Sequence, residues 1–521
     1  MSDTPNAVRA LASAETELFA NLAGRSVYLV GIGGCGMSGL ARMMKSRGAV
    51  VSGSDKEQSE TTEALVAEGL AVGFDQSRAW LPEACDVVVA TAAVRPDHPQ
   101  LLEAQRRGVP VYLYAEALGR SMTGRTGVAI AGTHGKSTTT AMLGCALTDA
   151  GLDPTVIVGA TSSQLGGGCL KPNTEGHRGE AEGTERRLDQ VPTGFRLGGN
   201  EIPRGRMVGK PGILLAEACE FNRSFHNFRP TIASISSVEA DHLDIYGSLD
   251  AVVEAFRDFA RLVPSKADGG RLLIAHDGAH RREVTAGLDC EVQTIGYSPE
   301  ADWVVGYEPA TRKVTVSHER EVVAAWTNLL PGAHNAMNAA TAFVLGTWLG
   351  GDAAVLGRSL GAFRGIDRRM QFLGERPMPS GGVVRVYDDY GHHPTEIDCT
   401  LRALRETERP QDRAGRLVCV FQPHQHSRTR HLMEEFASSF SQADIVIVPQ
   451  IYFVRDSQEE KQKVTAGDLV DRLRDKGVRA MHLYPFEAIV EQLENVCRGG
   501  DLLVVMGAGP VWQVARGFLK A

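Results

Sequence analysis

The sequence predicts an α/β protein of three domains, and three observations lead to this fold class. Short apolar runs alternate with segments of helical periodicity along most of the chain, which is typical of parallel sheets whose strands are joined by helices. A chain of 521 residues exceeds what one hydrophobic core usually fills. Glycine-rich loops follow two of the apolar runs, at the strand ends where such sheets bind ligands.

The first domain is expected over residues 1–118, with a Rossmann-like pattern after a stretch of helical spacing that ends near residue 24. The strand Ser26–Val30 is followed at once by Gly31-Ile32-Gly33-Gly34-Cys35-Gly36-Met37-Ser38 and by a helix that runs to Lys45. Asp55 comes about twenty residues later, where a carboxylate can hold ribose hydroxyls. This G-x-G-x-x-G loop predicts a nucleotide site. The alternative is that glycine only lets the strand and helix pack closely.

The second domain, residues 119–372, is expected to be a P-loop ATPase-like α/β domain. Val128–Ala131 reads as a buried strand, followed by Gly132-Thr133-His134-Gly135-Lys136-Ser137 and a helix from about Thr138. Glycine amides and the start of a helix can bind an oxyanion, while Lys136 can reach the β- and γ-phosphates of a nucleotide. The spacing differs from the common G-x-x-x-x-G-K-[ST] pattern, and the alternative is a glycine-rich turn with a solvated lysine.

Two later strands of the second domain end in acidic clusters, Glu217-Ala218-Cys219-Glu220 and Glu239-Ala240-Asp241-His242. Ligands gather at the carboxyl ends of the strands in such sheets. We therefore expect Glu217 and His242 to bind Mg²⁺, or Mn²⁺, together with Ser137. The alternatives are that the histidine is an ordinary polar residue and that Glu220 or Glu239 only solvates a loop.

Two further segments of the second domain have separate predictions. Residues 162–210 lack periodicity and apolar content, so we expect a flexible insertion there. Asn335 opens an alanine-rich helix, where its amide could read an adenine edge or could serve as the N-cap.

The third domain is expected over residues 373–521, again with a Rossmann-like alternation of strands and helices. Its strand ends carry cationic and phosphate-friendly groups, among them His392, His424 and Arg428, and a glycine pair at Gly507 and Gly509. It contains no second phosphate loop of the kind found in the second domain.

Composition excludes several classes of function. The formal charge of −8 lacks the basic excess of a nucleic-acid-binding protein, and the nine cysteines include no CxxC pair that would indicate zinc or a redox motif. No apolar run has the length of a membrane span, and the N-terminus has no signal-peptide pattern. We expect a cytoplasmic protein, a monomer or a homodimer, with no nucleic acid or membrane as partner.

The motifs GIGGCGMSG, AGTHGKSTTTAM, EADHLDIY, GAHNAMNA, RRMQFLGE, DDYGHHPTE and QPHQHSRTR occur in this order along the chain. In these motifs and their order the chain resembles the Mur ligases of peptidoglycan synthesis. The resemblance extends over roughly residues 26 to 515 and leaves out the N-terminal helix and the 162–210 insertion. It implies three domains: one for a UDP-sugar, one for ATP, and a mobile one that closes over both.

Within the family, the motifs are most similar to those of members that join L-alanine to UDP-N-acetylmuramate through an acyl phosphate, with ATP and Mg²⁺. The residues matching the UDP-sugar positions are Gly31, Gly33, Gly34, Gly36, Met37, Ser38 and Asp55. Those matching the ATP positions are Gly132, Thr133, His134, Gly135, Lys136, Ser137, Thr138, Asn335 and Arg369, and the metal positions are Ser137, Glu217 and His242. The implied catalytic residues are Lys136, Tyr390, His392 and Arg428.

The chain departs from the family pattern at three places. Cys219 stands where the family commonly has aspartate, and Gln425 stands where it has arginine. No lysine lies between Lys210 and Lys266, so we expect no carbamylated lysine of the kind that some Mur ligases carry.

Three other functions stay open. A recycling ligase that adds a whole tripeptide to UDP-N-acetylmuramate shares the first two domains' motifs, but typically has D-D-F-A-H-H-P-T-A where this chain has Asp388–Glu396. An NAD(P)-dependent oxidoreductase would explain the first glycine loop and leave the second without a use. A non-catalytic relative is suggested only by Cys219 and Gln425.

Overall fold

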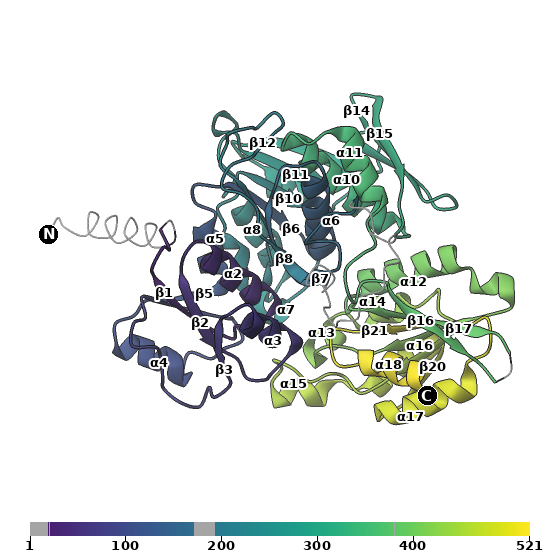
Figure 1. Ribbon diagram of the computed structural model, residues 1–521. Coiled ribbons are helices and arrows are strands. Elements are labelled where there is room, and N and C mark those ends of the chain that lie inside the picture. Colours follow the sequence, from purple (N-terminus) through teal and green to yellow (C-terminus); the bar gives the residue numbers. More distant parts are fainter. Residues whose placement is uncertain (1–18, 20, 171–192, 380) are drawn as a thin grey trace, which may run out of the picture. The chain divides into compact units, whose positions relative to one another are not determined.

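The computed structural model describes residue 19 and residues 21–170, 193–379 and 381–521 (Figure 1). Its contacts divide the chain into two compact units. Unit 1 comprises Met1–Val238, Val253–Trp303 and Thr341–Leu360, and unit 2 comprises Glu239–Val252, Val304–Ala340 and Gly361–Ala521. The chain passes between the units after Val238 and after Leu360, and also inside α8 (Leu249–Ala260), β13 (Trp303–Glu308) and α10 (Ala333–Trp348).

Unit 1 begins with a five-stranded parallel sheet in the order β3-β2-β1-β4-β5. Its strands are β1 (Ser26–Val30), β2 (Val50–Ser54), β3 (Ala71–Gly73), β4 (Val87–Ala90) and β5 (Val111–Leu113). The connecting helices are α2 (Cys35–Ser46), α3 (Glu60–Ala67), α4 (Pro99–Arg106) and α5 (Tyr114–Ser121). This order, with β1 between β2 and β4, places the loop after β1 where the strand order reverses, the usual ligand position in open α/β sheets.

The second sheet has ten strands, and the seven that lie wholly in unit 1 follow one another in the order β12-β11-β10-β6-β9-β7-β8. Its strands are β6 (Thr126–Ala131), β7 (Thr155–Ser162), β8 (Thr193–Arg196), β9 (Ile213–Glu217), β10 (Ile232–Ile235), β11 (Arg271–Ala275) and β12 (Glu291–Gly296). All neighbours pair in parallel except β7 and β8. The helices of this region are α6 (Lys136–Asp149), α9 (Arg281–Thr285) and α11 (Ala353–Gly361), with 3₁₀ turns η2 (Phe221–Asn227) and η3 (Lys266–Asp268).

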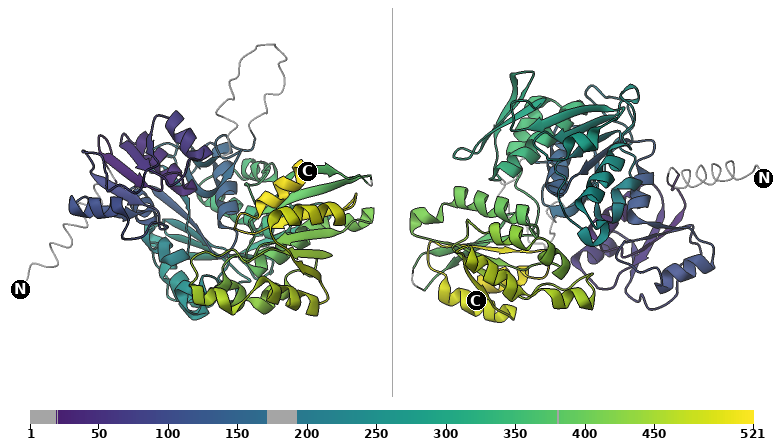
Figure 2. Two further views of the ribbon diagram at one scale, coloured as in Figure 1. Left: turned by 90° about the horizontal axis from the view of Figure 1, so that it is seen from below. Right: turned by 180° about the vertical axis from the view of Figure 1, so that it is seen from behind.

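Unit 2 contains a six-stranded sheet in the order β16-β17-β21-β18-β19-β20, parallel except for β16 and β17. The strands are β16 (Gln371–Pro377), β17 (Val383–Asp389), β18 (Leu417–Phe421), β19 (Ile445–Val448), β20 (Arg479–His482) and β21 (Leu502–Met506). The strands β14 (Lys313–His318) and β15 (Glu321–Thr327) also belong to unit 2 and pair in antiparallel fashion. Figure 2 shows these elements from two further directions.

Side chains of the six-stranded sheet alternate between two hydrophobic cores. Cys419 and Phe421 of β18 belong to one core, whereas Val418 and Val420 belong to the other. A strand buried on both faces explains the continuous apolar run Leu417–Phe421. Helices therefore cover both faces (Figure 1): α12 (Pro394–Glu408), α14 (Met433–Ser438) and α16 (Ala466–Asp475) contribute to the first core, and α17 (Phe486–Val496) and α18 (Trp512–Lys520) contribute to the second. Unit 2 also contains α7 (Leu243–Tyr246), α13 (His426–His431), α15 (Gln458–Lys463) and the 3₁₀ turn η4 (Pro410–Arg413).

The α/β fold class predicted from the sequence is confirmed, with three corrections in detail. The helix after the phosphate loop begins at Lys136, two residues before the expected start, because Gly135 in a left-handed conformation ends the turn. The sequence predicts a strand over Val111–Tyr114, but β5 ends at Leu113 and Tyr114 opens α5. Residues 193–210 were expected to lack structure, but β8 pairs with β7 and Ile202 is fully buried.

Other expectations fall on parts of the chain that the structure does not describe. The helix expected near the N-terminus lies almost wholly outside the described residues, as do residues 171–192 of the expected insertion. Among the described residues, none of the helices combines the length and apolar character that crossing a membrane requires.

Candidate active site

The phosphate loop of unit 1 follows β6, whose neighbours β9 and β10 run parallel to it. At Gly132 φ is 130°, and an added Cβ would lie 2.0 Å from the Ser236 hydroxyl oxygen, so the position requires glycine. The amide of Thr133 donates to the Ser237 carbonyl at 2.9 Å, and the amide of His134 donates to the Ser237 hydroxyl at 3.1 Å. The loop is thereby fixed to the segment that follows β10.

Lys136 is the first residue of α6, and acceptors enclose its ammonium group. The ammonium donates to the carbonyls of Gly132 and Thr133 at 2.6 and 3.0 Å and lies 2.8 Å from Glu220 Oε2. Burial alone would lower the pKa of Lys136, but Glu220 and the weaker effects of Cys219 and Glu217 together raise the pKa above its ordinary value. The group is therefore charged at neutral pH, and a bound phosphate would compete with Glu220 for it.

Ser137 and Glu217 form the second polar contact of this loop. The Ser137 hydroxyl donates to Glu217 Oε1 at 2.9 Å, and the amide of Gly159 donates to the other carboxylate oxygen at 2.9 Å. A hydroxyl and a carboxylate in contact beside a phosphate loop fit a hard cation such as Mg²⁺, which prefers oxygen ligands. His242, the third predicted ligand, lies in unit 2, so its part in this site stays a prediction.

The first glycine loop joins β1 to α2, and Asp55 at the end of β2 closes it. The amide of Gly33 donates to Asp55 Oδ2 at 2.7 Å. An added Cβ on Gly36 would lie 2.5 Å from the Tyr114 hydroxyl oxygen, so a larger residue would displace this ring. The structure therefore brings Asp55, which was predicted to hold ribose hydroxyls, into contact with the loop that was predicted to bind the nucleotide.

Other residues of the first glycine loop form contacts within unit 1. The Gly34 amide donates to the Gly31 carbonyl at 3.3 Å. The Met37 side chain is buried, and the Ser38 hydroxyl donates to the Cys35 carbonyl at 2.9 Å. Contacts of Met37 and Ser38 with a UDP-sugar stay a prediction.

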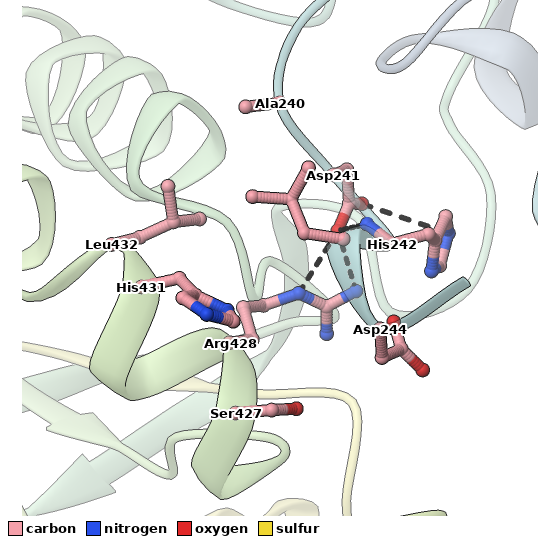
Figure 3. A pocket seen from close by; sticks show the side chains of 9 residues that line it. Ala240, Asp241, His242, Asp244, Ser427, Arg428, His431 and Leu432 are labelled. Carbon is pink, nitrogen blue, oxygen red and sulfur yellow. Dashed lines mark hydrogen bonds and ion pairs between the residues drawn. The ribbon is translucent and has the colours of Figure 1, made fainter. Parts of the chain in front are cut away.

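Arg428 on α13 lies at the centre of a cluster in unit 2. Its Nε and Nη2 donate to Asp241 Oδ1 at 3.0 and 2.7 Å, and both residues are less than a tenth exposed. Figure 3 shows this pair in a small pocket lined by α7 and α13, with Leu432 on one side. Burial alone would raise the pKa of Asp241, but the guanidinium of Arg428 holds it well below its usual range.

Two neutral histidines lie beside Arg428. The rings of His392 and His424 have centroids 5.8 Å apart, and burial lowers the pKa of each to about 3. Nη1 of Arg428 lies 3.3 Å from His424 Nδ1, so this nitrogen accepts. His392 Nδ1 lies 3.2 Å from the Tyr390 carbonyl and therefore carries the proton of its ring.

Tyr390 and Arg369 belong to the same cluster. The guanidinium carbons of Arg368 and Arg369 lie 5.0 and 5.4 Å from the centroid of the Tyr390 ring. Arg369 also pairs with Glu396 Oε1 at 3.2 Å, and Glu396 Oε2 accepts from the His392 amide at 2.9 Å. The structure thus brings together a residue predicted to bind ATP and residues predicted to bind the amino acid.

Asn335 lies in the first turn of α10, which begins at Ala333. Its Nδ2 donates to the Pro331 carbonyl at 2.8 Å. The alternative that Asn335 is the N-cap is therefore wrong, because an N-cap precedes the first helical residue and accepts a hydrogen bond from a backbone amide. Its role as an adenine reader stays a prediction.

The two departures from the family pattern have different surroundings. Cys219 is exposed, whereas Gln425 is only 1% exposed and has a φ of 69°. The Gln425 amide donates to the Tyr452 carbonyl at 3.1 Å, and its Nε2 lies 3.5 Å from Asp244. The loop before α13 is therefore held by backbone bonding around a buried side chain.

Sequence reasoning missed the acids that hold the two buried cations. Glu220 was weighed only as a solvated loop residue, and Asp241 was given no role. Both belong to the acidic clusters at strand ends, and a buried lysine or arginine needs a carboxylate partner. That requirement could have indicated that one member of each cluster faces a cation.

Models of three domains match the chain. A "Mur ligase family, catalytic domain" matches residues 26–126, a "Mur ligase middle domain" matches residues 206–346, and a "Mur ligase, glutamate ligase domain" matches residues 368–509. These matches leave the predicted boundaries near residues 118 and 372 as predictions.

A UDP-N-acetylmuramate–L-alanine ligase of Agathobacter rectalis is 34% identical over 95% of this chain and 97% of its own length. A solved UDP-N-acetylmuramate–alanine ligase of Thermotoga maritima has a TM-score of 0.70 at 24% identity, covering 95% of this chain and 98% of its own. A murein peptide ligase of Psychrobacter arcticus has a TM-score of 0.65 at 23% identity, with the same coverage of both chains. Sequence similarity of this extent and the three matched domains show that the chain belongs to the Mur ligase family.

Proposed function

We propose that this protein is an ATP-dependent ligase that joins L-alanine to UDP-N-acetylmuramate in peptidoglycan precursor synthesis. The observation that carries the proposal is the phosphate loop of unit 1, with Lys136 at the start of α6 and Glu217 on its serine. The near-complete coverage of a relative with this activity supports it. The substrates would be ATP, L-alanine and UDP-N-acetylmuramate.

The first step is phosphoryl transfer. A carboxylate is a poor acyl donor and has to be activated first. A carboxylate oxygen of the sugar attacks the γ-phosphorus of ATP, and the bond between this phosphorus and the oxygen that bridges it to the β-phosphate breaks. The products are an acyl phosphate and ADP. Lys136 would hold the transferring phosphate and spread its developing charge. Ser137 and Glu217 would hold Mg²⁺ with His242, and the ion would supply further charge stabilisation.

The second step is attack of the amine of L-alanine on the acyl phosphate. The amide forms as phosphate leaves, and the amine loses a proton. Arg428 would bind the carboxylate of the amino acid, because a guanidinium matches a carboxylate in geometry. With a pKa of about 3, His392 and His424 are too weak as bases to deprotonate an ammonium at neutral pH, so they would orient groups by hydrogen bonding.

Three regions would divide this work. Residues 1–118 would bind the UDP-sugar through Gly31, Gly33, Gly34 and Gly36, residues 119–372 would bind ATP, and residues 373–521 would bind the amino acid. Asn335 and Arg369 would contact the adenine and the phosphates of ATP. Water would have to be excluded during both steps, since it hydrolyses an acyl phosphate.

Phosphate release with ATP, Mg²⁺ and UDP-N-acetylmuramate tests the proposal, with each amino acid and the murein tripeptide supplied in turn. We expect release with L-alanine, and release slower by about a hundredfold or more when the Lys136→Ala variant replaces the wild type. Release with the tripeptide alone would establish the recycling activity instead. No release with any acceptor, or an absorbance change with a nicotinamide cofactor, would overturn the proposal.

A further inference from the structure

Asp241 binds more than one functional group of unit 2. Its Oδ1 accepts from Arg428 Nε and Nη2 and from the backbone amide of His242, which lies at 2.7 Å. Its Oδ2 lies 3.7 Å from Nε2 of His242 (Figure 3). One carboxylate thus contacts the predicted amino-acid ligand Arg428 and the predicted metal ligand His242.

The contact with Asp241 leaves a defined part of the Arg428 guanidinium for a substrate. Asp241 takes the edge formed by Nε and Nη2, so the edge formed by Nη1 and Nη2 still has hydrogens to donate. Neutral His424 accepts at Nη1, 3.3 Å away, and cannot compete with an anion by charge. A second carboxylate can therefore bind end-on to a guanidinium that Asp241 already holds side-on.

The segment that carries Asp241 is itself attached to the C-terminal part of unit 2. The Thr395 hydroxyl donates to Glu239 Oε2 at 2.6 Å, and His393 Nε2 lies 3.3 Å from the Ala240 carbonyl. His242 follows with a φ of 52°, a left-handed conformation that non-glycine residues rarely adopt. The hydrogen bond from its amide to Asp241 Oδ1 stabilises that conformation.

We propose that Asp241 is a positioning residue that orients Arg428 for the carboxylate of the amino acid and fixes the backbone of His242. This inference rests on the proposed function. Asp241 itself touches no substrate in this account, and it acts through the two residues that it holds. Its loss leaves a buried guanidinium without its partner and frees the turn at His242.

A buried ion pair that only stabilises unit 2 is the competing explanation. Loss of such a pair would lower the melting temperature and the amount of active protein, but the remaining molecules would bind substrates normally. Loss of a positioning residue changes binding constants for some substrates and leaves others unaffected. The Michaelis constants, measured separately, therefore distinguish the two.

The test compares Asp241→Asn with Asp398→Asn, which removes the carboxylate of the exposed pair between Asp398 and Arg402 on α12. For Asp241→Asn we expect the KM for L-alanine to rise by about tenfold to a hundredfold and the Mg²⁺ concentration for half activity to rise as well. The KM for UDP-N-acetylmuramate should change by less than about threefold. Asp398→Asn should match the wild type in all three.

Arg428→Lys provides a second measurement if Asp241→Asn folds poorly, since lysine keeps the charge and loses the two-pronged geometry. We expect it to raise the KM for L-alanine as well, and the double variant should be no worse than the poorer single variant. Unchanged constants in Asp241→Asn, or fully additive effects in the double variant, would overturn the inference. An inactive wild type would instead refute the proposed function.

Discussion

The phosphate loop of unit 1 and the Arg428 cluster of unit 2 both hold a buried cation against a carboxylate. Lys136 lies 2.8 Å from Glu220, and Arg428 lies 2.7 Å from Asp241. The two pairs differ in how the cation and its carboxylate are placed along the chain. Lys136 belongs to a continuous strand, loop and helix, and Glu220 follows the neighbouring strand β9. Asp241 and Arg428 are 187 residues apart in sequence and belong to no common motif of strand and loop.

The two sites also differ in how charge is arranged. In unit 1 the ammonium is surrounded by acids and carbonyl groups, and its pKa is raised despite burial. In unit 2 the guanidinium is flanked by His392 and His424, which burial keeps neutral. The proposed phosphate and metal site thus places its cation among carboxylates and carbonyl groups, whereas the proposed amino-acid site places Arg428 between the carboxylate of Asp241 and two neutral histidines. Variants of each site should therefore have separable effects.

Lys136→Ala should have the largest effect. We expect turnover to fall by about a hundredfold or more, because one preorganised charge at the transferring phosphate is lost. Binding of UDP-N-acetylmuramate, measured by calorimetry, should be nearly unchanged, since residues 1–118 are proposed to bind that substrate. Lys266→Ala, which removes an exposed lysine of the same unit, is the matched control. Loss of UDP-sugar binding along with activity would contradict the assignment of regions.

Arg428→Ala should follow, with the KM for L-alanine raised and kcat/KM lowered by about thirtyfold. That pattern is expected when a contact that binds the amino acid before the reaction is lost. Steady-state kinetics at saturating ATP measure it. A change in the KM for ATP alone would place Arg428 at the nucleotide and would remove the distinction between the two sites.

Glu217→Gln should raise the Mg²⁺ concentration for half activity by about tenfold, because an amide is a weaker ligand for a hard cation. Substitution of His242 should act in the same direction, and Mn²⁺ should rescue it unevenly, since Mn²⁺ tolerates different ligands. Activity titrated with each metal ion provides the measurement. If neither variant alters the metal dependence, the predicted metal site is wrong.

His392 and His424 should stay neutral over the range in which free histidine titrates. The folded protein lowers the pKa of both to about 3, whereas the unfolded chain takes up protons near pH 6.5. Their contribution to stability is therefore complete above about pH 6.5 and is lost as the pH falls towards 3, at about 1 kcal/mol per pH unit for each histidine. NMR of the imidazole resonances should show no protonation between about pH 8 and pH 5.

Glutamine variants of these two histidines provide the matching stability test. His392→Gln and His424→Gln should each reduce the loss of stability between about pH 7 and pH 5, since glutamine takes up no proton. A titration midpoint near 6.5 in the folded protein would show that the cluster is charged and that the contrast with unit 1 is mistaken.

The sequence predicted the helices, strands and loops that a short stretch of residues specifies by itself. Val128–Ser137 indicated the strand, the loop and the helix that follow one another in unit 1. The edge strand β8 was missed because its residues, Thr193–Arg196, have no apolar alternation, and only pairing with β7 stabilises them. Tyr114 was assigned to a strand because it follows an apolar run. The one signal for the start of a helix there is Glu116, whose carboxylate accepts a hydrogen bond from the Leu113 amide.

Partners of the functional side chains were harder to predict than the side chains themselves. Glu217 and Glu220 lie three residues apart after one strand, and the sequence does not indicate which of them faces Ser137 and which faces Lys136. Asp241 faces Arg428 because α13 packs near the turn that follows β10, a long-range contact without a local signal. Such assignments depend on tertiary packing, which overrides local pattern.

Gln425→Arg should have the smallest effect and tests whether the loop before α13 has to supply a cation. Other Mur ligases that the chain resembles have arginine here, yet Gln425 is 1% exposed and its side chain reaches towards Asp244, which is exposed. An arginine can extend along the same path and pair with Asp244, so we expect kcat and the KM for L-alanine within about threefold of the wild type. The backbone bond from residue 425 to Tyr452 is unaffected by the change of side chain. Loss of activity in Gln425→Arg together with full activity in Arg428→Ala would mean that this loop presents its residues differently from the family, and the roles given to Tyr390, His392 and Arg428 would then be withdrawn.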